Sequence, residues 1–356
     1  MEPPNKPAAA PRASIKRINV ALQGGGSHGA YSWGVLDRLL ADEHIEIEAV
    51  SGTSAGAMNA VVMAEGLVEG GRAKAREQLD DFWRRVAYRV PSSQAQGWGN
   101  DWTKAWEKAW VFDKNAAATM ASWWSQFASP YQFNPLNINP LRDILLREVD
   151  FERVRRCKTM QLFISATNVR TGQIKVFTGD EITADAILAS ACLPTVFQAV
   201  EIGPEAYWDG GYMGNPAIEP FFTSCLSSDL LLVQINPIVR DEVPRNPQDI
   251  ADRVNEISFN GPLLRELRHV EFVNECLRRG ELKDSGYREI FLHRVGGGAD
   301  LQAYPASSKL DGDLALIEAL HDLGFKAMDT WLGENFDKLG QASTMPLEEM
   351  HARRGA

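Results

Sequence analysis

A Gly-x-Ser-x-Gly pattern is the part of this sequence best suited to nucleophilic chemistry. Gly52, Ser54 and Gly56 lie between residues 45–50, which alternate as a strand does, and residues 57–64, which have the composition of a buried helix. In a tight strand–turn–helix connection, small residues flank the serine and its hydroxyl is exposed at the head of the helix. The helix dipole and unpaired amides there favour the negative charge that develops in acyl transfer. An ordinary turn can carry the same pattern, so the other motifs must decide.

A second glycine-rich turn contains Gly24, Gly25, Gly26 and Gly29 and follows a predicted strand at residues 15–22. Because these residues have no side chains, the backbone can approach a ligand closely and its amides can converge on an oxyanion. If the two predicted strands are parallel neighbours, both turns lie at the same sheet edge and face one crevice. A simple turn between strand and helix is the alternative interpretation.

The glycine-rich turn also satisfies the G-x-G-x-x-G fingerprint of dinucleotide-binding folds. Glu48 follows at about the 20-residue distance at which that fingerprint expects an acid for the ribose. Two observations argue against this interpretation: Glu48 lies inside the second predicted strand, and that strand ends in the serine turn. Nucleotide binding is nevertheless kept as a competing interpretation.

A serine nucleophile needs a base, which is usually histidine. Of the six histidines, His293 is predicted on a strand and His321 on a helix, and both are interpreted as structural. Asp209 is the better candidate, because it ends a predicted strand and is followed by Gly210 and Gly211, which let the backbone turn and expose the carboxylate. An aspartate in a simple β-turn is the alternative.

The elements that must position these residues alternate between strands and helices. This order predicts an α/β fold with a mostly parallel central sheet covered by helices on both faces, in three layers. We expect one catalytic domain over residues 15–340, a disordered leader at 1–14 and a C-terminal tail at 341–356. The predicted strands are 15–22, 45–50, 161–167, 173–177, 207–209, 230–235 and 289–293, and the predicted helices include 30–40, 72–88, 141–149, 184–191, 248–279 (interrupted at Gly261-Pro262) and 311–332.

Residues 91–140 contain six of the ten tryptophans. Trp102, Trp106 and Trp110 recur every four residues and would share one side of a helix. Tryptophans at this spacing are often part of a core. The functional interpretation is a helical cap inserted over the active site, whose indole rings contact acyl chains or a lipid surface.

Composition narrows the function classes. The 356 residues are 44% hydrophobic and 24% charged, as in globular proteins, and the net charge of −10 argues against nucleic acid as a partner. Four widely spaced cysteines predict reduced thiols and no metal site. The chain has no uncharged run long enough to span a membrane and no signal peptide, so a cytoplasmic location is expected.

Four motifs together resemble patatin-like phospholipases. They are the glycine loop Gly24–Gly29, the serine turn Gly52–Gly56, Ser190-Ala-Cys-Leu-Pro194 and Asp209-Gly-Gly211, and they occur in the order seen in that family. The resemblance spans roughly residues 17–294 and implies a Ser–Asp dyad acyl hydrolase with a patatin-like fold.

The resemblance implies that Ser54 is the nucleophile, that Asp209 is its base and that the amides of Gly24, Gly25 and Gly26 form the oxyanion hole. It also implies a lipid or other ester substrate, no cofactor and no metal, with transient contact with a membrane surface. The chain departs from the family pattern twice: His28 stands where arginine is more common, and Gly211 stands where alanine is frequent. We expect His28 to affect head-group preference.

Three other functions remain open. A carboxylesterase or polyester depolymerase would use the same chemistry on another ester. A nucleotide-binding protein would use the glycine-rich turn, and a catalytically silent module would use the tryptophan-rich segment to bind lipid. The sequence leaves acyl length, head group and oligomeric state undetermined.

Overall fold

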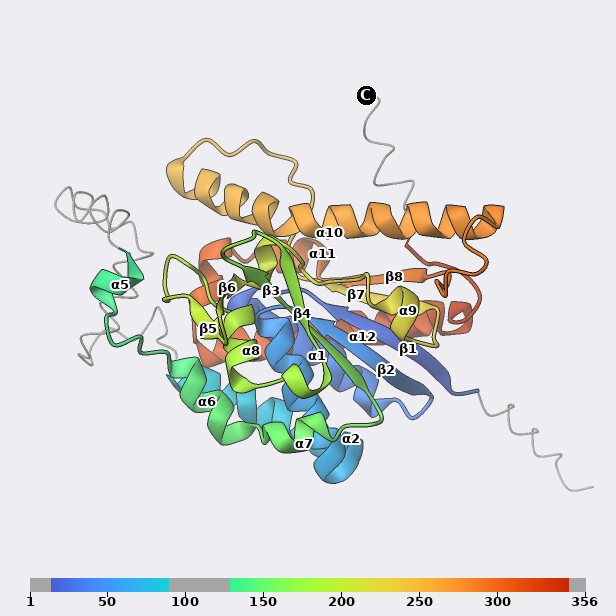
Figure 1. The fold of residues 1–356 in the computed structure, drawn as a ribbon, viewed down its shortest axis with the longest axis horizontal. Helices are drawn as coiled ribbons and strands as arrows, with labels where there is room; N and C mark the ends of the chain where they lie inside the picture. The colour runs from blue at the N-terminus through green and yellow to red at the C-terminus, as the bar shows by residue number, and fades with distance from the viewer. Residues whose placement is uncertain (1–13, 90–128, 346–356) are drawn as a thin grey trace, which may run out of the picture.

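The computed structural model describes residues 14–89 and 129–345, which build an eight-stranded mixed sheet between layers of helices (Figure 1). The strand order is β5-β6-β3-β2-β1-β7-β8, and β4 pairs with β3 beside this path. The strands are β1 (Lys16–Leu22), β2 (Ile45–Gly52), β3 (Gln161–Asn168), β4 (Ile174–Phe177), β5 (Val200–Ile202), β6 (Glu205–Asp209), β7 (Asp229–Gln234) and β8 (Phe291–Gly296).

Strands β3, β2, β1, β7 and β8 are parallel, whereas β4, β5 and β6 join by antiparallel pairings. The parallel strands are rich in branched apolar residues because both faces of the sheet are buried. In β1, Val20 and Leu22 pack into the larger core and Ala21 into the smaller one, as the alternation of side chains along a strand requires.

The larger core lies under α1 (Gly29–Ala41), α2 (Ala55–Arg89) and α12 (Leu314–Asn335). The smaller core lies under α9 (Phe221–Ser224) and α10 (Pro247–Arg279), which forms the top of the molecule in Figure 1. The remaining helical segments are α5 (Pro130–Phe133), α6 (Pro140–Glu148), α7 (Phe151–Arg155), α8 (Ala184–Ser190), α11 (Gly298–Gln302), η1 (Gly26–His28), η2 (Gly179–Glu181), η3 (Gly210–Tyr212), η4 (Ala306–Leu310) and η5 (Phe336–Lys338).

The structure confirms the predicted three-layer α/β fold with a largely parallel sheet. It contradicts the predicted break at Gly261-Pro262, because α10 runs through both residues. A proline normally clashes with the Cβ of the preceding residue in a helix, and Gly261 has no Cβ. Pro262, Leu263 and Leu267 are buried, so packing on the sheet also favours the continuous helix.

Several predictions concern residues outside the described ranges. They include the leader at 1–14 except for its last residue, most of the tail at 341–356 and most of the proposed cap at 91–140, with Trp102, Trp106 and Trp110. These domain boundaries and the cap stay predictions. Of the helices in the described part of the chain, none is both long and apolar enough to cross a membrane.

Candidate active site

Ser54 occupies the sharp turn between β2 and α2. Its φ is +54°, in the left-handed region that residues with a side chain seldom adopt. The turn closes through the Gly56 amide, which donates to the Thr53 carbonyl at 2.8 Å. A Cβ on Gly52 would lie 2.6 Å from the Gly56 carbonyl oxygen, so the two glycines permit the close turn. This is the backbone geometry of a nucleophile elbow.

The sheet register brings Asp209 level with this turn. Gly52, the last residue of β2, pairs with Ile164 of β3, and two residues further along β3, Ala166 pairs with Asp209. Ser54 is likewise two residues beyond Gly52. The antiparallel strand β6 thus ends beside the carboxyl end of the parallel strand β2, although 155 residues separate Ser54 from Asp209.

The Ser54 side chain lies beside the Asp209 carboxylate and favours its charged form. Asp209 is 1% exposed, and its Oδ1 also accepts the Gly211 amide at 2.7 Å. Burial disfavours the charged carboxylate and raises the pKa of Asp209 to about 7, although the bonds from Gly211 and Ser54 act in the opposite direction. A carboxylate with this pKa is a stronger base than an exposed aspartate and is still partly ionised at neutral pH.

The Ser190-Ala-Cys-Leu-Pro194 motif contacts both members of this pair. The Ser190 hydroxyl accepts the Ser54 amide at 2.9 Å, and the Cys192 carbonyl accepts the Asp209 amide at 2.7 Å. Ser190 ends α8 and is completely buried. The motif was recognised in the sequence, but its role in holding two distant backbone segments was not predicted.

The glycine-rich loop lies directly beside Ser54. A Cβ on Gly24 would lie 2.9 Å from the Ser54 Cβ, so only glycine allows this approach. The Gly24 amide already donates to Asn215 Oδ1 at 2.7 Å, and it is therefore not available to a ligand in this structure, contrary to expectation. Within the described residues, the amides of Gly25 and Gly26 donate no such bond.

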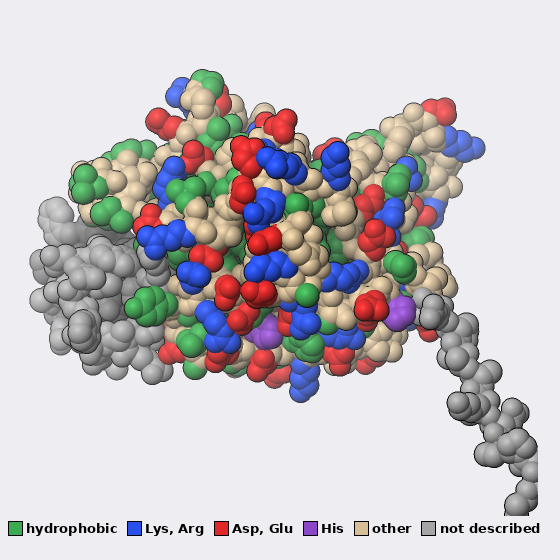
Figure 2. Space-filling view, turned by 90° about the horizontal axis from the view of Figure 1, so that it is seen from below, with side chains coloured by type: hydrophobic (Ala, Val, Ile, Leu, Met, Phe, Trp, Pro, Cys, Tyr) green, Lys and Arg blue, Asp and Glu red, His purple; other side chains and the backbone are tan. Residues whose placement is uncertain are grey.

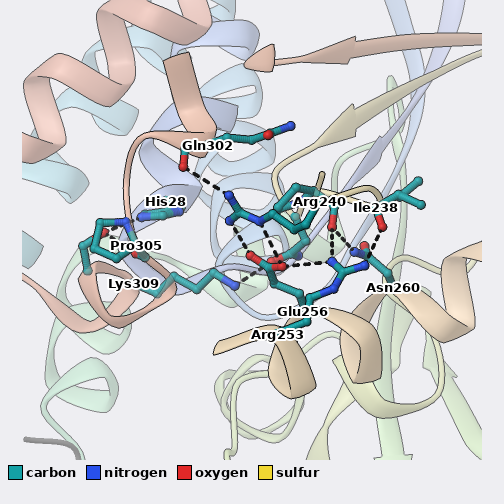
Figure 3. Close-up of polar contacts among 12 residues, drawn as sticks. His28, Ile238, Arg240, Arg253, Glu256, Asn260, Gln302, Pro305 and Lys309 are labelled. Carbon is teal, nitrogen blue, oxygen red and sulfur yellow. Dashed lines mark hydrogen bonds and ion pairs between the residues drawn. The ribbon is translucent and has the colours of Figure 1, made fainter. Parts of the chain in front are cut away.

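A chain of polar contacts fixes the glycine loop from behind. Gln23 Oε1 accepts the amides of Ile235 and Asn236 at 2.9 Å each, and Asn236 Nδ2 donates to the Gly24 carbonyl at 3.0 Å. Lys309 Nζ donates to Asn236 Oδ1 at 2.6 Å. Figure 3 shows the Lys309 side chain pointing toward the ion-paired group around Glu256. No pattern in the sequence singled out Asn215, Asn236 or Lys309.

Lys309 lies close to several charges. Burial lowers its pKa to about 8, while the carboxylates of Glu256 and Asp252 act in the opposite direction. Burial would raise the pKa of Glu256, but hydrogen bonds from Arg240 at 2.6 Å and Arg253 at 3.0 Å outweigh it and lower that pKa. Lys309 therefore connects this charged group, drawn in Figure 3, to Asn236 and through it to the Gly24 carbonyl.

His28 is not placed as expected for a head-group contact. It is 3% exposed, and its Nε2 forms a 2.8 Å hydrogen bond with the Ser308 hydroxyl. Burial, with a smaller contribution from the charge of Lys309, lowers its pKa to about 3, so the ring is neutral. The buried neutral ring connects the glycine loop to Ser308 of η4, and the predicted substrate contact finds no support.

The other motif glycines pack against the rest of the site. A Cβ on Gly29 would collide with Ala55, one on Gly210 with the Ser165 carbonyl and one on Gly211 with the Phe259 ring. The elements around Ser54 and Asp209 are therefore in direct contact with one another.

The histidines considered as bases have other partners. His293 is completely buried between Asp229 and Thr344, at 2.9 and 3.0 Å. Asp229 begins β7 and so lies at the amino ends of the parallel strands, whereas Ser54 follows the carboxyl end of β2. His321 contacts Asp37 and Asp322. Both contacts agree with structural roles.

Glu48 is also placed away from any ribose position. Its two carboxylate oxygens accept the amides of Leu226 and Ser227, each at 2.7 Å, just before the amino end of β7. The dinucleotide interpretation needs this acid near the glycine loop at the carboxyl ends of the strands, so this arrangement argues against it.

Comparison with known proteins gives a family. A family model described as patatin-like phospholipase matches residues 20–222, which is more than half of the chain. No curated protein sequence matched the chain.

Solved structures give weaker likenesses. VipD from Legionella pneumophila is 13% identical with a TM-score of 0.43, over 95% of this chain and 73% of VipD. The type III effector protein ExoU is 13% identical with a TM-score of 0.34, over 90% of this chain and 54% of ExoU. A complex of SpcU with ExoU from Pseudomonas aeruginosa gives 14% identity and a TM-score of 0.31, over 89% of this chain and 53% of the matched chain. The chain thus spans about half the length of ExoU.

Proposed function

The chain belongs to the patatin-like phospholipase family, a family of lipid hydrolases, and from this premise we propose that it hydrolyses lipid ester bonds through a dyad of Ser54 and Asp209. The observation that carries the proposal is that Ser54, held in a strained turn, lies beside a buried carboxyl whose pKa is raised to about 7.

In the proposed first step, Ser54 Oγ attacks the ester carbonyl carbon while its proton passes to an Asp209 oxygen. The tetrahedral intermediate collapses, the C–O bond to the leaving alcohol breaks and Asp209 returns the proton to that alcohol. In the second step water attacks the acyl-enzyme, Asp209 takes a proton from the water, and the fatty acid leaves as Ser54 is reprotonated. One carboxyl thus serves both steps.

The proposed oxyanion hole consists of the Gly25 and Gly26 amides. Gly24 has a different role in this proposal, because Asn215 already accepts its amide at 2.7 Å and so orients the loop. Ser54 precedes α2, so the positive end of the helix dipole adds to the stabilisation of the oxyanion. The loss of one donor from such a site typically costs about 3 kcal/mol of transition-state stabilisation.

The proposal is tested by labelling with a fluorophosphonate, followed by a panel of p-nitrophenyl and phospholipid esters. We expect labelling and hydrolysis in the wild type and neither in Ser54→Ala or Asp209→Asn, with folding of each variant checked by circular dichroism. A preference for acetate over long-chain esters would favour a simple carboxylesterase. Absence of labelling in the folded wild type would favour the silent lipid-binding module.

A further inference from the structure

The first part of helix α10 has its polarity reversed. Helices at a protein surface usually bury their apolar side and expose their charges. In α10, Glu256 is 2% exposed and ion-paired to Arg253, whereas Ile250, Val254 and Ile257 are exposed at 45%, 58% and 55%. These three residues follow the spacing i, i+4, i+7 and therefore form one stripe.

The inner side of the same turns is occupied by polar contacts. Figure 3 shows Arg253, Glu256 and Asn260 extending from this helix toward Arg240 and Lys309. A polar cleft of about 860 Å³ also lies along it, lined by residues that include Asp249 and Asp252. The charged side chains on the inner side thus have partners within the protein, and the apolar stripe lies on the outer side of the same turns.

Between Ile250 and Phe272, no acid of α10 is fully exposed: Glu256 is buried, and Asp252, Glu266 and Glu271 are half-buried. The exposed residues of α10 over this stretch are Ile250, Ala251, Val254, Ile257, Ser258, Arg265, Arg268, His269 and Phe272. The acid Glu266 in the same stretch is turned inward, where it accepts backbone hydrogen bonds from Ile218 and Glu219. We call these nine exposed residues the α10 outer face.

Apolar side chains beside exposed basic side chains are typical of helices that lie in the plane of a membrane interface. Arg265 and Arg268 are both exposed, the charge of Arg265 acts on the half-buried Glu266, and Phe272 toward the C-terminal end of the helix is 66% exposed. The opposite side of the molecule differs: Figure 2 shows Lys and Arg interspersed with Asp and Glu there. The chain as a whole carries a net charge of −10, so the basic character of this face is local.

We propose that the α10 outer face docks onto the surface of an anionic phospholipid bilayer, with the helix parallel to the membrane. The apolar stripe inserts among the acyl chains near the head groups, and Arg265 and Arg268 contact lipid phosphates. The choice of a lipid partner rests on the proposed function. A second copy of the chain would present the same two arginines and no exposed acid on this face, so the charges would oppose pairing.

The position of α10 connects this surface to the candidate active site. On its inner side, Phe259 packs against Gly211 and Asn260 accepts a hydrogen bond from Gln23 at 3.3 Å. These residues flank Asp209 and the glycine loop. Docking through the outer side of the same turns therefore places α10 between the membrane and the Ser54–Asp209 pair.

Vesicle binding by the full chain with Ser54→Ala tests the proposal without hydrolysis of the lipid. We expect co-sedimentation with vesicles of phosphatidylcholine mixed with phosphatidylglycerol and weaker binding to phosphatidylcholine alone. Adding Ile257→Asp should lower the partition coefficient by about tenfold or more, because burial of an isoleucine side chain is lost. Adding Arg265→Gln with Arg268→Gln should lower it by about tenfold and weaken its salt dependence.

Leu146→Asp is the matched control, because Leu146 is exposed at the same 55% and belongs to α6, which lies on the other side of the sheet from α10 in Figure 1. It should leave vesicle binding unchanged. Equal binding by the Ile257→Asp and Leu146→Asp variants would overturn the proposal. A wild-type dimer that becomes a monomer on Ile257→Asp would also overturn the proposal, because it would show that a second copy of the chain covers the α10 outer face.

The two proposals fail differently. With Ser54 intact, Ile257→Asp should keep fluorophosphonate labelling and hydrolysis of p-nitrophenyl acetate at wild-type rates while vesicle binding falls. Labelling without any wild-type vesicle binding would overturn the docking surface alone. Vesicle binding that depends on Ile257, in a protein that is never labelled, would support the surface and contradict the proposed enzyme.

Discussion

The Ser54 amide donates a hydrogen bond to the Ser190 hydroxyl at 2.9 Å, across 136 residues of sequence. Ser54 holds a positive φ, and this bond is one of the contacts that fix the strained turn. The end of helix α8 thereby sets the position of the hydroxyl that faces Asp209.

We predict that Ser190→Ala lowers kcat for a soluble ester by about tenfold, because it leaves the half-buried Ser54 amide without its acceptor, at a cost of about 1–3 kcal/mol. The measurement is the rate of fluorophosphonate labelling in protein shown to be folded. A labelling rate equal to that of the wild type would show that the bond does not position the nucleophile.

The raised pKa of Asp209 predicts the pH dependence of activity. The proposed base acts only when ionised, and burial raises its pKa to about 7. We therefore expect kcat/KM to rise with pH through about 7 and to level off above it. A profile that is flat between pH 5 and pH 9, each value being about two units from that pKa, would exclude this carboxyl as the base.

The raised pKa makes Asp209 a better base, but it also predicts that the folded protein loses stability as the pH rises. The pKa of Asp209 is raised from 3.8 in the unfolded chain to about 7 in the folded one, so the folded state loses stability as pH rises between these values. Asp209→Asn should therefore have a higher Tm than the wild type at pH 8. The corresponding gain in the free energy of unfolding is at most about 4 kcal/mol. The difference should vanish at pH values below the unfolded pKa. An equal or lower Tm of the variant at pH 8 would show that the buried, ionised Asp209 carboxylate does not destabilise the folded protein.

Lys309 is predicted to position the glycine loop through Asn236. Removal of its ammonium group in Lys309→Met should lower kcat by about tenfold, since the contact to Asn236 Oδ1 at 2.6 Å is lost, with little change in KM for a short ester. Lys338→Met is a matched control, because Lys338 makes a similar 2.8 Å contact with Asn335 away from the loop. Equal effects of the two variants would mean that Lys309 acts only on stability.

His293 provides a test of the alternative base. It lies on β8, buried between Asp229 and Thr344, and β8 is three strands away from β2 and the serine turn. We expect His293→Gln to lower Tm but to leave ester hydrolysis per folded molecule unchanged. Loss of activity in folded His293→Gln protein would return histidine to the mechanism.

The sequence predicted the local parts of the site well, because a strand followed by a tight glycine turn and a helix is encoded within a few residues. Both glycine-flanked turns and the strand that ends at Asp209 lie where they were expected. The contact between them depends on the antiparallel entry of β6 beside β3, which no local pattern encodes.

Residues that act through single long-range contacts were not predictable. Asn215 and Lys309 reach the glycine loop from other segments, and neither belongs to a spacing that indicates its partner. The reversed polarity of α10 shows a second limit. The pattern predicted a helix correctly, but the inward charges depend on Arg240 and Lys309, which lie outside that helix.

Mass-spectrometric mapping of the fluorophosphonate adduct tests whether Ser54 and Asp209 act as a pair. We predict a single adduct on Ser54 in the wild type and none in folded Asp209→Asn protein at neutral pH. An adduct on another residue, or labelling of Ser54 at the wild-type rate after Asp209→Asn, would contradict the pairing of this hydroxyl with this carboxyl.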